Sequence, residues 1–328
     1  MLRKIIVGAA NVLDETYHAL TADKPHLLSL IFHKLFADRA EMQDVGGMPM
    51  EAVTVSDFQT ILDILATMQY TFASPDDLQN PVFLEKNKKI AFITFDDGYL
   101  NNFRALAVLE KYKTPALFNI TTSYTENERP YWWDILYAER SKRSSEEKIL
   151  QEVELIKKKT PFANAWEYIF AEFGKRAEVF QNELHRPMTI GELSEFSQSP
   201  YVFLGNHTHN HAALAFHDEK STHFEIEKAQ ILLQNWTNKK ISVMSYPHGS
   251  FRTESLQIAE KFNLKTGLSI DNIKNYLPLQ SEEKKILGRF SFDGLREKPE
   301  ISLERAIKSR PERPFESALY SFVKKIKS

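Results

Sequence analysis

Residues 89–121 follow a strand, helix, strand order that limits the folds open to this chain. Residues 89–95 are apolar, β-branched or aromatic and predict a buried strand, and residues 117–121 predict a second one. Between them, residues 99–112 carry apolar side chains at helical spacing until Pro115 breaks the pattern. A helix-length crossover between two strands requires parallel pairing, which indicates an α/β fold.

The same alternation continues on both sides of this unit. The apolar spacing predicts helices at 54–66, 218–237 and 252–262, and strands at 202–204, 241–246, 265–270 and 285–290. Thr189 and Glu192 have the spacing of a capping box, which marks a helix start. Residues 124–137 are interpreted as an aromatic loop, residues 141–186 as a helical excursion from the sheet, and residues 315–328 as a surface helix.

Side chains of chemical interest follow four of the predicted strands. Since active sites of α/β barrels assemble at the carboxyl ends of the strands, we expect these residues to meet there. They are Asp96, Asp97, His207, Pro247, His248 and Arg289.

Two of these segments together indicate a hydrolytic metal site. Adjacent carboxylates at Asp96 and Asp97 repel each other and need a compensating cation or proton. His207 and His211 lie four residues apart, and one carboxylate with two imidazoles is a common ligand set for a catalytic metal. Each segment alone also fits an ordinary turn or polar loop, and His209 is expected to be exposed between the ligands.

Composition excludes several classes of protein. A chain of 328 residues that is 42% hydrophobic can bury one barrel-sized core or two smaller ones. The net charge of −2 gives no broad attraction to nucleic acid, and the absence of cysteine excludes disulfides and thiolate metal sites. No segment approaches the ~18 apolar residues of a transmembrane helix. Residues 1–13 lack a clear signal cleavage site, so we expect a cytoplasmic chain.

Four motifs resemble those of the polysaccharide deacetylases, carbohydrate esterase family 4 with the NodB homology domain. Thr-Phe-Asp-Asp-Gly at 94–98 is similar to the family's first motif, and His-Thr-His-Asn-His at 207–211 is similar to the second. Tyr-Pro-His-Gly at 246–249 resembles a third motif, and Leu-Gly-Arg at 287–289 resembles the late Leu-Pro-Arg segment of some members. The resemblance covers about residues 28 to 295.

The resemblance implies an α/β fold of a particular kind, a distorted (β/α) barrel with about seven strands and a helical insertion. It implies one catalytic domain over residues 1–328, with the barrel core at about 28–295, the insertion at about 141–186 and a helical tail at about 300–328. The implied reaction is metal-dependent hydrolysis that removes an acetyl group from an N- or O-acetylated sugar of a polysaccharide or its precursor.

The motifs of the family imply roles for the matching residues of this chain. Asp97, His207 and His211 are expected to bind a divalent metal, most often Zn²⁺. Asp96 is expected to be the general base that takes a proton from the attacking water. The third motif offers Tyr246 and Pro247 as substrate-binding residues.

Two departures from the family pattern concern the remaining catalytic groups. The third motif lacks the arginine that often holds the base aspartate, and Arg289 stands where many members carry a late histidine acid. His248 is therefore one candidate for the general acid, and Arg289 is a candidate to orient Asp96 or to stabilise the oxyanion.

Other residues have two open interpretations each. Trp132, Trp133 and Asp134 fit either a sugar-stacking wall or plain packing. His33 ends an apolar run at a place where relatives often carry a histidine, but packing in a helix or the core is the favoured interpretation. The basic residues at the chain end fit a solvated helix or weak contact with an anionic membrane.

The expected partner is an acetylated saccharide, and binding to nucleic acid is not expected. The sequence does not fix the oligomeric state. Two other functions stay open. One is a metal-dependent hydrolase of a small cyclic amide, since fold and metal do not settle the substrate. The other is a non-catalytic saccharide-binding relative, suggested by the missing late histidine.

Overall fold

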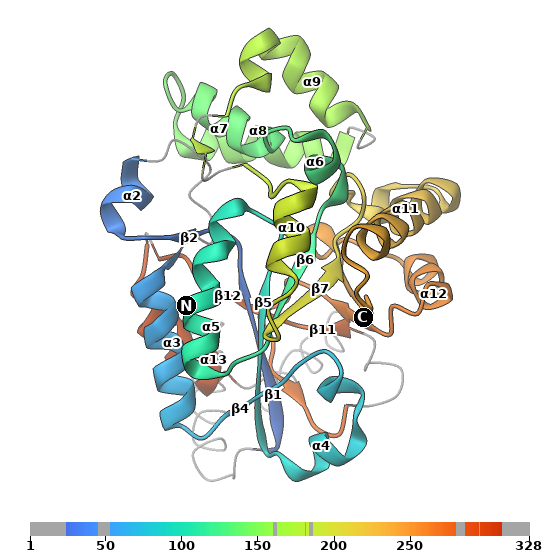
Figure 1. Cartoon of the computed structure of the whole chain (residues 1–328). Coiled ribbons are helices and arrows are strands. Elements are labelled where there is room, and N and C mark those ends of the chain that lie inside the picture. The colour runs from blue at the N-terminus through green and yellow to red at the C-terminus, as the bar shows by residue number, and fades with distance from the viewer. Residues whose placement is uncertain are drawn as a thin grey trace, which may run out of the picture.

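The structure is a computed structural model of the chain. It describes residues 24–44, 53–159, 163–180, 182–183, 186–279, 286–294 and 296–309. Within these ranges ten strands form one mostly parallel sheet, which curls into a nearly closed barrel surrounded by helices (Figure 1). The predicted distorted (β/α) barrel is therefore confirmed.

Seven positions make up the ring of parallel strands, and the last position is shared by two short strands. In spatial order they are β1 (His26–Phe32), β5 (Lys89–Phe95), β6 (Ala116–Ile120), β7 (Val202–Asn206), β8 (Val243–Ser245), β9 (Thr266–Leu268), β11 (Ile286–Leu287) and β12 (Phe290–Ser291). Two further strands join the sheet at its margins: β4 (Thr71–Phe72) pairs with β5, and β10 (Asn275–Tyr276) runs antiparallel to β1. A separate pair is formed by β2 (Leu35–Phe36) and β3 (Val53–Thr54).

The ring closes through a break in the strand predicted at 285–290. β11 pairs with β9, whereas β12 pairs with β1 on the other side of the seam. Gly288 lies in the break, and a Cβ there would approach the carbonyl oxygen of Asp271 to 2.6 Å, so only glycine fits without a shift. The prediction of one continuous strand was wrong because the chain changes pairing partner at this point.

The helices cover the barrel wall and one end. They are α2 (Arg39–Asp44), α3 (Val55–Thr67), α4 (Pro81–Lys86), α5 (Ala105–Tyr112), α6 (Thr122–Asn127), α7 (Trp132–Arg140), α8 (Glu146–Lys159), α9 (Ala163–Phe173), α10 (Ile190–Phe196), α11 (Glu219–Thr237), α12 (Thr253–Lys261) and α13 (Pro299–Lys308). Short 3₁₀ turns are η1 (Asp77–Gln79), η2 (Leu100–Arg104), η3 (Gly174–Glu178), η5 (Leu214–Phe216) and η6 (Pro247–Gly249). Figure 1 shows α7, α8 and α9 together at the top of the molecule.

Most predicted elements appear close to their expected bounds. The helix expected at 99–112 begins as η2 and continues as α5, and the capping box of Thr189 and Glu192 starts α10. The interpretation of residues 124–137 as a loop was wrong, because most of them lie in α6 and α7. Burial of Trp132 and Leu136, both fully inside, stabilises a helix where local propensity is weak.

A column of aromatic rings fixes the strands that lead to the site. The rings of Phe95 and Phe118 stack with centroids 4.8 Å apart, and Phe32 lies 5.2 Å from Phe95. Phe196 of α10 meets Phe118 edge-on at 4.7 Å. Burying each ring stabilises the fold by about 1.5–3 kcal/mol. The packed rings therefore hold β1, β5 and β6 in place relative to one another.

Some predictions fall on residues outside the described ranges. These are the cytoplasmic start at 1–13 and the surface helix at 315–328. The single catalytic domain over 1–328 stays a prediction. Among the described residues, no helix combines the length and apolar character needed to cross a membrane.

Candidate metal centre and active site

Asp97, His207 and His211 come together at the carboxyl ends of β5 and β7. One ligand atom from each lies within 4.8 Å of the other two, and all three side chains are buried. His211 Nε2 is 3.3 Å and His207 Nε2 is 3.5 Å from Asp97 Oδ1. Buried Asp97 Oδ1 accepts no hydrogen bond from any described residue, an arrangement that suits a divalent cation between these atoms.

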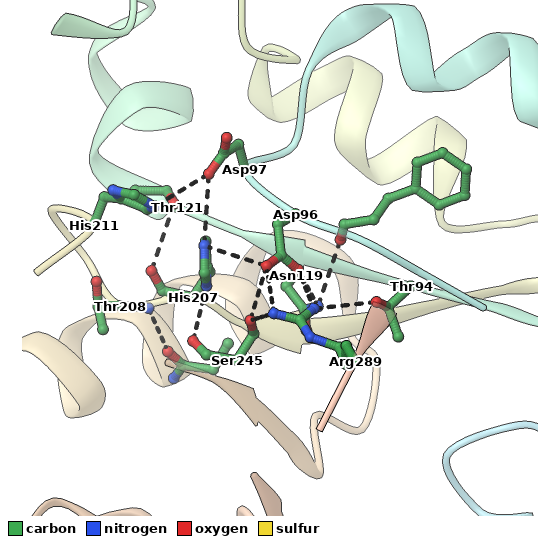
Figure 2. A network of polar contacts seen from close by, with 12 residues as sticks. Thr94, Asp96, Asp97, Asn119, Thr121, His207, Thr208, His211, Ser245 and Arg289 are labelled. Atoms are coloured by element: carbon green, nitrogen blue, oxygen red, sulfur yellow. Dashed lines mark hydrogen bonds and ion pairs between the residues drawn. The ribbon is translucent and has the colours of Figure 1, made fainter. Parts of the chain in front are cut away.

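His207 is held in the tautomer that a metal ligand needs. Its Nδ1 lies 2.8 Å from the carbonyl oxygen of Ser245, which can only accept, so Nδ1 carries the proton. In the neutral ring Nε2 is then the atom without a proton, and it faces Asp97 (Figure 2).

The backbone around the ligands is bent at several non-glycine positions. Asp97, Thr208 and His211 have φ values of 75°, 63° and 59°, in the left-handed region that costs about 1–3 kcal/mol per residue. Hydrogen bonds hold these turns: Asn206 Oδ1 accepts from the amide of Thr208, and Thr208 Oγ1 accepts from the amide of Ala212 at 2.8 Å. The histidine loop is therefore shaped in advance of metal binding.

Arg289 holds Asp96 with two parallel hydrogen bonds. Its Nη1 and Nη2 donate to Asp96 Oδ1 and Oδ2 at 2.9 and 2.8 Å (Figure 2). Its Nε donates to the carbonyl of Ser269. Asn119 Nδ2 and Ser245 Oγ donate to the same carboxylate at 2.7 and 3.0 Å. Asp96 Oδ2 is 3.7 Å from Nε2 of the metal-triad residue His207.

This setting keeps Asp96 ionised. Burial is the largest single influence on the pKa of Asp96 and would raise it. The charges of Arg289 and His207 and the hydrogen bonds from Arg289 together outweigh burial, so the pKa lies well below its usual range. Ser245 Oγ joins this pair, because it donates to Asp96 and accepts from Arg289 Nη2 at 3.0 Å. The late arginine thus makes the contact that the third motif would otherwise supply.

A cavity of about 440 Å³ opens above the triad. Asp96, Asp97, His207 and His211 line it together with His33, which follows β1. Three residues of α8 form another part of the wall, so the helical excursion takes part in the site; they are Val153, Glu154 and Lys157. His33 was predicted to serve in packing, whereas here it is only half-buried and faces the cavity.

His248 lies beside the triad. Its ring centroid is 4.7 Å from that of His211, and its Nε2 has no hydrogen-bond partner among the described residues. Burial, followed by the charge of Lys157, holds the pKa of His248 well below its ordinary value. Burial likewise keeps His211 neutral by lowering its pKa.

The predicted substrate-binding residues lie in different places. Trp132 and Trp133 line the cavity, but Asp134 lies behind them and does not. Tyr246 and Pro247 are buried outside the cavity lining, where the Tyr246 ring packs 4.8 Å from that of Phe251.

Asp134 belongs to a buried polar network that the sequence did not reveal. Lys34 Nζ lies 2.5 Å from Asp134 Oδ1, and the Tyr99 hydroxyl donates to Oδ2 at 2.8 Å. Trp133 Nε1 donates to the Tyr99 oxygen at 2.8 Å, and the Trp133 ring lies 4.6 Å from that of His211. Burial, then the charge of Asp134, raises the pKa of Tyr99 well above its usual value, so its hydroxyl stays a donor. The network fixes the wall against which His211 packs.

Comparison with known proteins agrees with this geometry. The family model for polysaccharide deacetylases matches residues 84–267, which is more than half of the 328-residue chain. This chain therefore belongs to the polysaccharide deacetylase family, hydrolases that act on carbon–nitrogen bonds other than peptide bonds. The resemblance found in the motifs is confirmed. Among curated proteins, no sequence matches this chain.

Solved structures show the same fold. A deacetylase of Streptococcus pyogenes in complex with acetate is 18% identical, with a TM-score of 0.57, and the match covers 88% of this chain and 100% of that one. A putative polysaccharide deacetylase of Bacillus anthracis is 16% identical, with a TM-score of 0.59. The match covers 87% of this chain and 70% of that one. A de-N-acetylase of Aggregatibacter actinomycetemcomitans is 15% identical, with a TM-score of 0.55. The match covers 80% of this chain and 94% of that one.

Proposed function

We propose that this chain removes an acetyl group from an N- or O-acetylated sugar in a metal-dependent hydrolysis. The observation that carries the proposal is one cavity in which a carboxylate and two imidazoles converge beside a second, arginine-held carboxylate. Two imidazoles and one carboxylate leave coordination positions open and suit Zn²⁺, which we propose as the metal. A bound divalent metal would polarise the acetyl carbonyl and acidify water at this place.

The chain's own groups supply the remaining steps. We assign the general base to Asp96, because Arg289 keeps it ionised and fixes the direction of its oxygens. Proton delivery to the leaving group is assigned to His248, whose Nε2 lies beside the triad and has no hydrogen-bond partner in the described part of the chain. Since burial keeps His248 neutral, it has to receive a proton during turnover before it can donate one.

The test measures metal content and acetate release together, in wild type, Asp97→Ala and Asp96→Asn, on a panel of acetylated saccharides. We expect Asp97→Ala to lose both metal and activity. Asp96→Asn should keep the metal but lose about 10²–10⁴-fold in kcat, the usual contribution of a general base. Asp76→Ala is the matched control, because its carboxylate is exposed and pairs with Lys240 at the surface, away from the cavity.

Other outcomes would redirect the assignment. A protein that binds metal but releases acetate from no saccharide would favour a cyclic amide substrate or a non-catalytic saccharide-binding role. A wild type that binds no divalent metal would contradict the site assignment itself.

A further inference from the structure

The cavity mouth presents an exposed aromatic ring that the reaction chemistry does not use. Phe216 lines the same cavity as the metal triad, yet it is 60% exposed, whereas the triad at the floor is almost fully buried. Ile270, which follows β9, lines the mouth as well and is 46% exposed. Single exposed apolar residues are common on protein surfaces, but two that share one cavity with buried catalytic groups indicate a binding surface.

The position of Phe216 is fixed by the backbone around it. The turn η5 buries Leu214 completely and directs Phe216 outward. The amide of Phe216 donates to the carbonyl of Ala213 at 3.0 Å, and Arg252 donates to the carbonyl of His217. The ring therefore stands on a braced turn that begins three residues after the ligand His211.

The opposite side of the mouth is braced too. A Cβ at Gly249 would come within 2.9 Å of the Ile270 side chain, so the absence of a side chain at Gly249 lets Ile270 pack directly over the loop that carries His248. The mouth is thus shaped by two separate loops, one after β7 and one after β9.

The tryptophans in the cavity wall cannot provide the same surface. Trp132 is fully buried, and Trp133 is only 8% exposed. The ring of Trp133 lies 4.9 Å from Tyr131, in a stacked arrangement, and 4.6 Å from His211. Both tryptophan rings are covered by other residues of the wall. Phe216, in contrast, lines the cavity and exposes a face of its ring.

We propose that Phe216 and Ile270 form a subsite for the pyranose ring next to the acetylated one. The inference rests on the proposed function. An acetyl group that reaches the buried triad leaves its neighbouring sugar at the mouth, where the apolar C–H face of a pyranose can stack on an aromatic ring. The substrate is then a chain of at least two sugars, not a free monosaccharide.

The test compares wild type with Phe216→Ala, Phe216→Trp and Phe170→Ala. Phe170 of α9 is the matched control, because it is an exposed phenylalanine that does not line the cavity. Binding of N-acetylglucosamine and of its β-linked pentamer to each metal-loaded protein is measured by titration calorimetry, which requires no turnover.

We expect Phe216→Ala to weaken pentamer binding roughly tenfold, about the effect of one lost stacking contact. The same change should leave monosaccharide binding unaltered. Phe216→Trp should bind the pentamer like wild type, and so should Phe170→Ala. Equal pentamer binding by Phe216→Ala and wild type would overturn the subsite, and so would an equal loss for monomer and pentamer.

Two readouts separate this inference from the proposed reaction. Wild type that binds the pentamer but releases no acetate would contradict the reaction and leave the subsite supported. Wild type that binds no saccharide, yet hydrolyses 4-nitrophenyl acetate only with metal present, would overturn the subsite and support a metal hydrolase.

Discussion

At the scale of single residues, the contact between Asp96 and Arg289 determines what the site can do. Two opposite charges lie fully inside the protein, joined by two hydrogen bonds. Removing one partner of such a pair leaves an uncompensated buried charge, which is far more costly than removing both.

We therefore expect Arg289→Gln to lower the free energy of unfolding by about 3–5 kcal/mol in metal-free protein. The double variant Asp96→Asn/Arg289→Gln should lose clearly less, because no unpaired charge remains. Urea denaturation of wild type, both single variants and the double variant measures this coupling. If the loss of unfolding free energy in the double variant equals the sum of the two single losses, Asp96 and Arg289 do not stabilise each other.

His26 couples stability to pH at the opposite end of β1. Its Nδ1 donates to the carbonyl of Lys24, and its Nε2 accepts from the hydroxyl of Tyr70 at 2.8 Å, so the native state needs the neutral ring. Burial lowers the pKa of His26 to about 4, whereas an unfolded histidine titrates near about 6.5.

Between these two pKa values the unfolded chain binds the extra proton, so stability rises with pH there. The contribution of His26 is complete above pH about 6.5 and is lost as the pH falls through about 4. We expect wild type to lose more stability than His26→Gln between pH 7 and pH 4.5, measured by urea midpoints. Parallel pH curves for the two proteins would contradict this role.

Sequence patterns predicted the chemistry of the site better than its supporting contacts. Asp97, His207 and His211 follow apolar strands within short motifs, so local sequence was enough to bring them together. The pairing of Lys34 with Asp134 was not visible, because the two residues are separated by 100 positions and meet only after α7 folds onto the barrel. The exposure of Phe216 is hidden for the same reason, since periodicity does not tell which residue of a turn faces a cavity.

At the scale of elements, the break between β11 and β12 sets the position of Arg289. The amide of Gly288 donates to Asn275 Oδ1 and its carbonyl accepts from Asn275 Nδ2, so one side chain holds both sides of the break. The sequence predicted one strand at 285–290, but the tertiary structure decides that β9 and β1 each pair with one half of it.

Gly288→Ala should disturb both the seam and the site. The new Cβ would meet Ile273 and the carbonyl of Asp271, so we expect a loss of about 1–3 kcal/mol in the free energy of unfolding and lower kcat from a displaced Arg289. Gly191→Ala is the control, since a Cβ there meets nothing within 4 Å and alanine favours a helix. Equal stability of the two variants would exclude a steric role for Gly288.

At the scale of the whole molecule, the metal site joins elements that are distant in sequence. Asp97 follows β5, while both histidines follow β7, and β6 lies between these strands. A ligand that binds only the folded arrangement stabilises it by mass action.

Saturating Zn²⁺ should therefore raise the melting temperature of wild type, and EDTA should reverse the rise. At a free metal concentration a thousand times Kd, the expected gain is about 4 kcal/mol. Differential scanning calorimetry of wild type and Asp97→Ala measures it, and the variant should show no rise. A similar rise in the variant would place the bound metal elsewhere.

Closure of the barrel by its last strand separates two events during synthesis of the chain. Asp96, Asp97, His207 and His211 leave the ribosome before Arg289, because the chain is made from its N-terminus. A nascent chain that stops before residue 286 contains the Asp97, His207 and His211 cluster but lacks the guanidinium that binds Asp96. The two hydrogen bonds from Arg289 that hold Asp96 therefore form only when the final strand is inserted between β9 and β1.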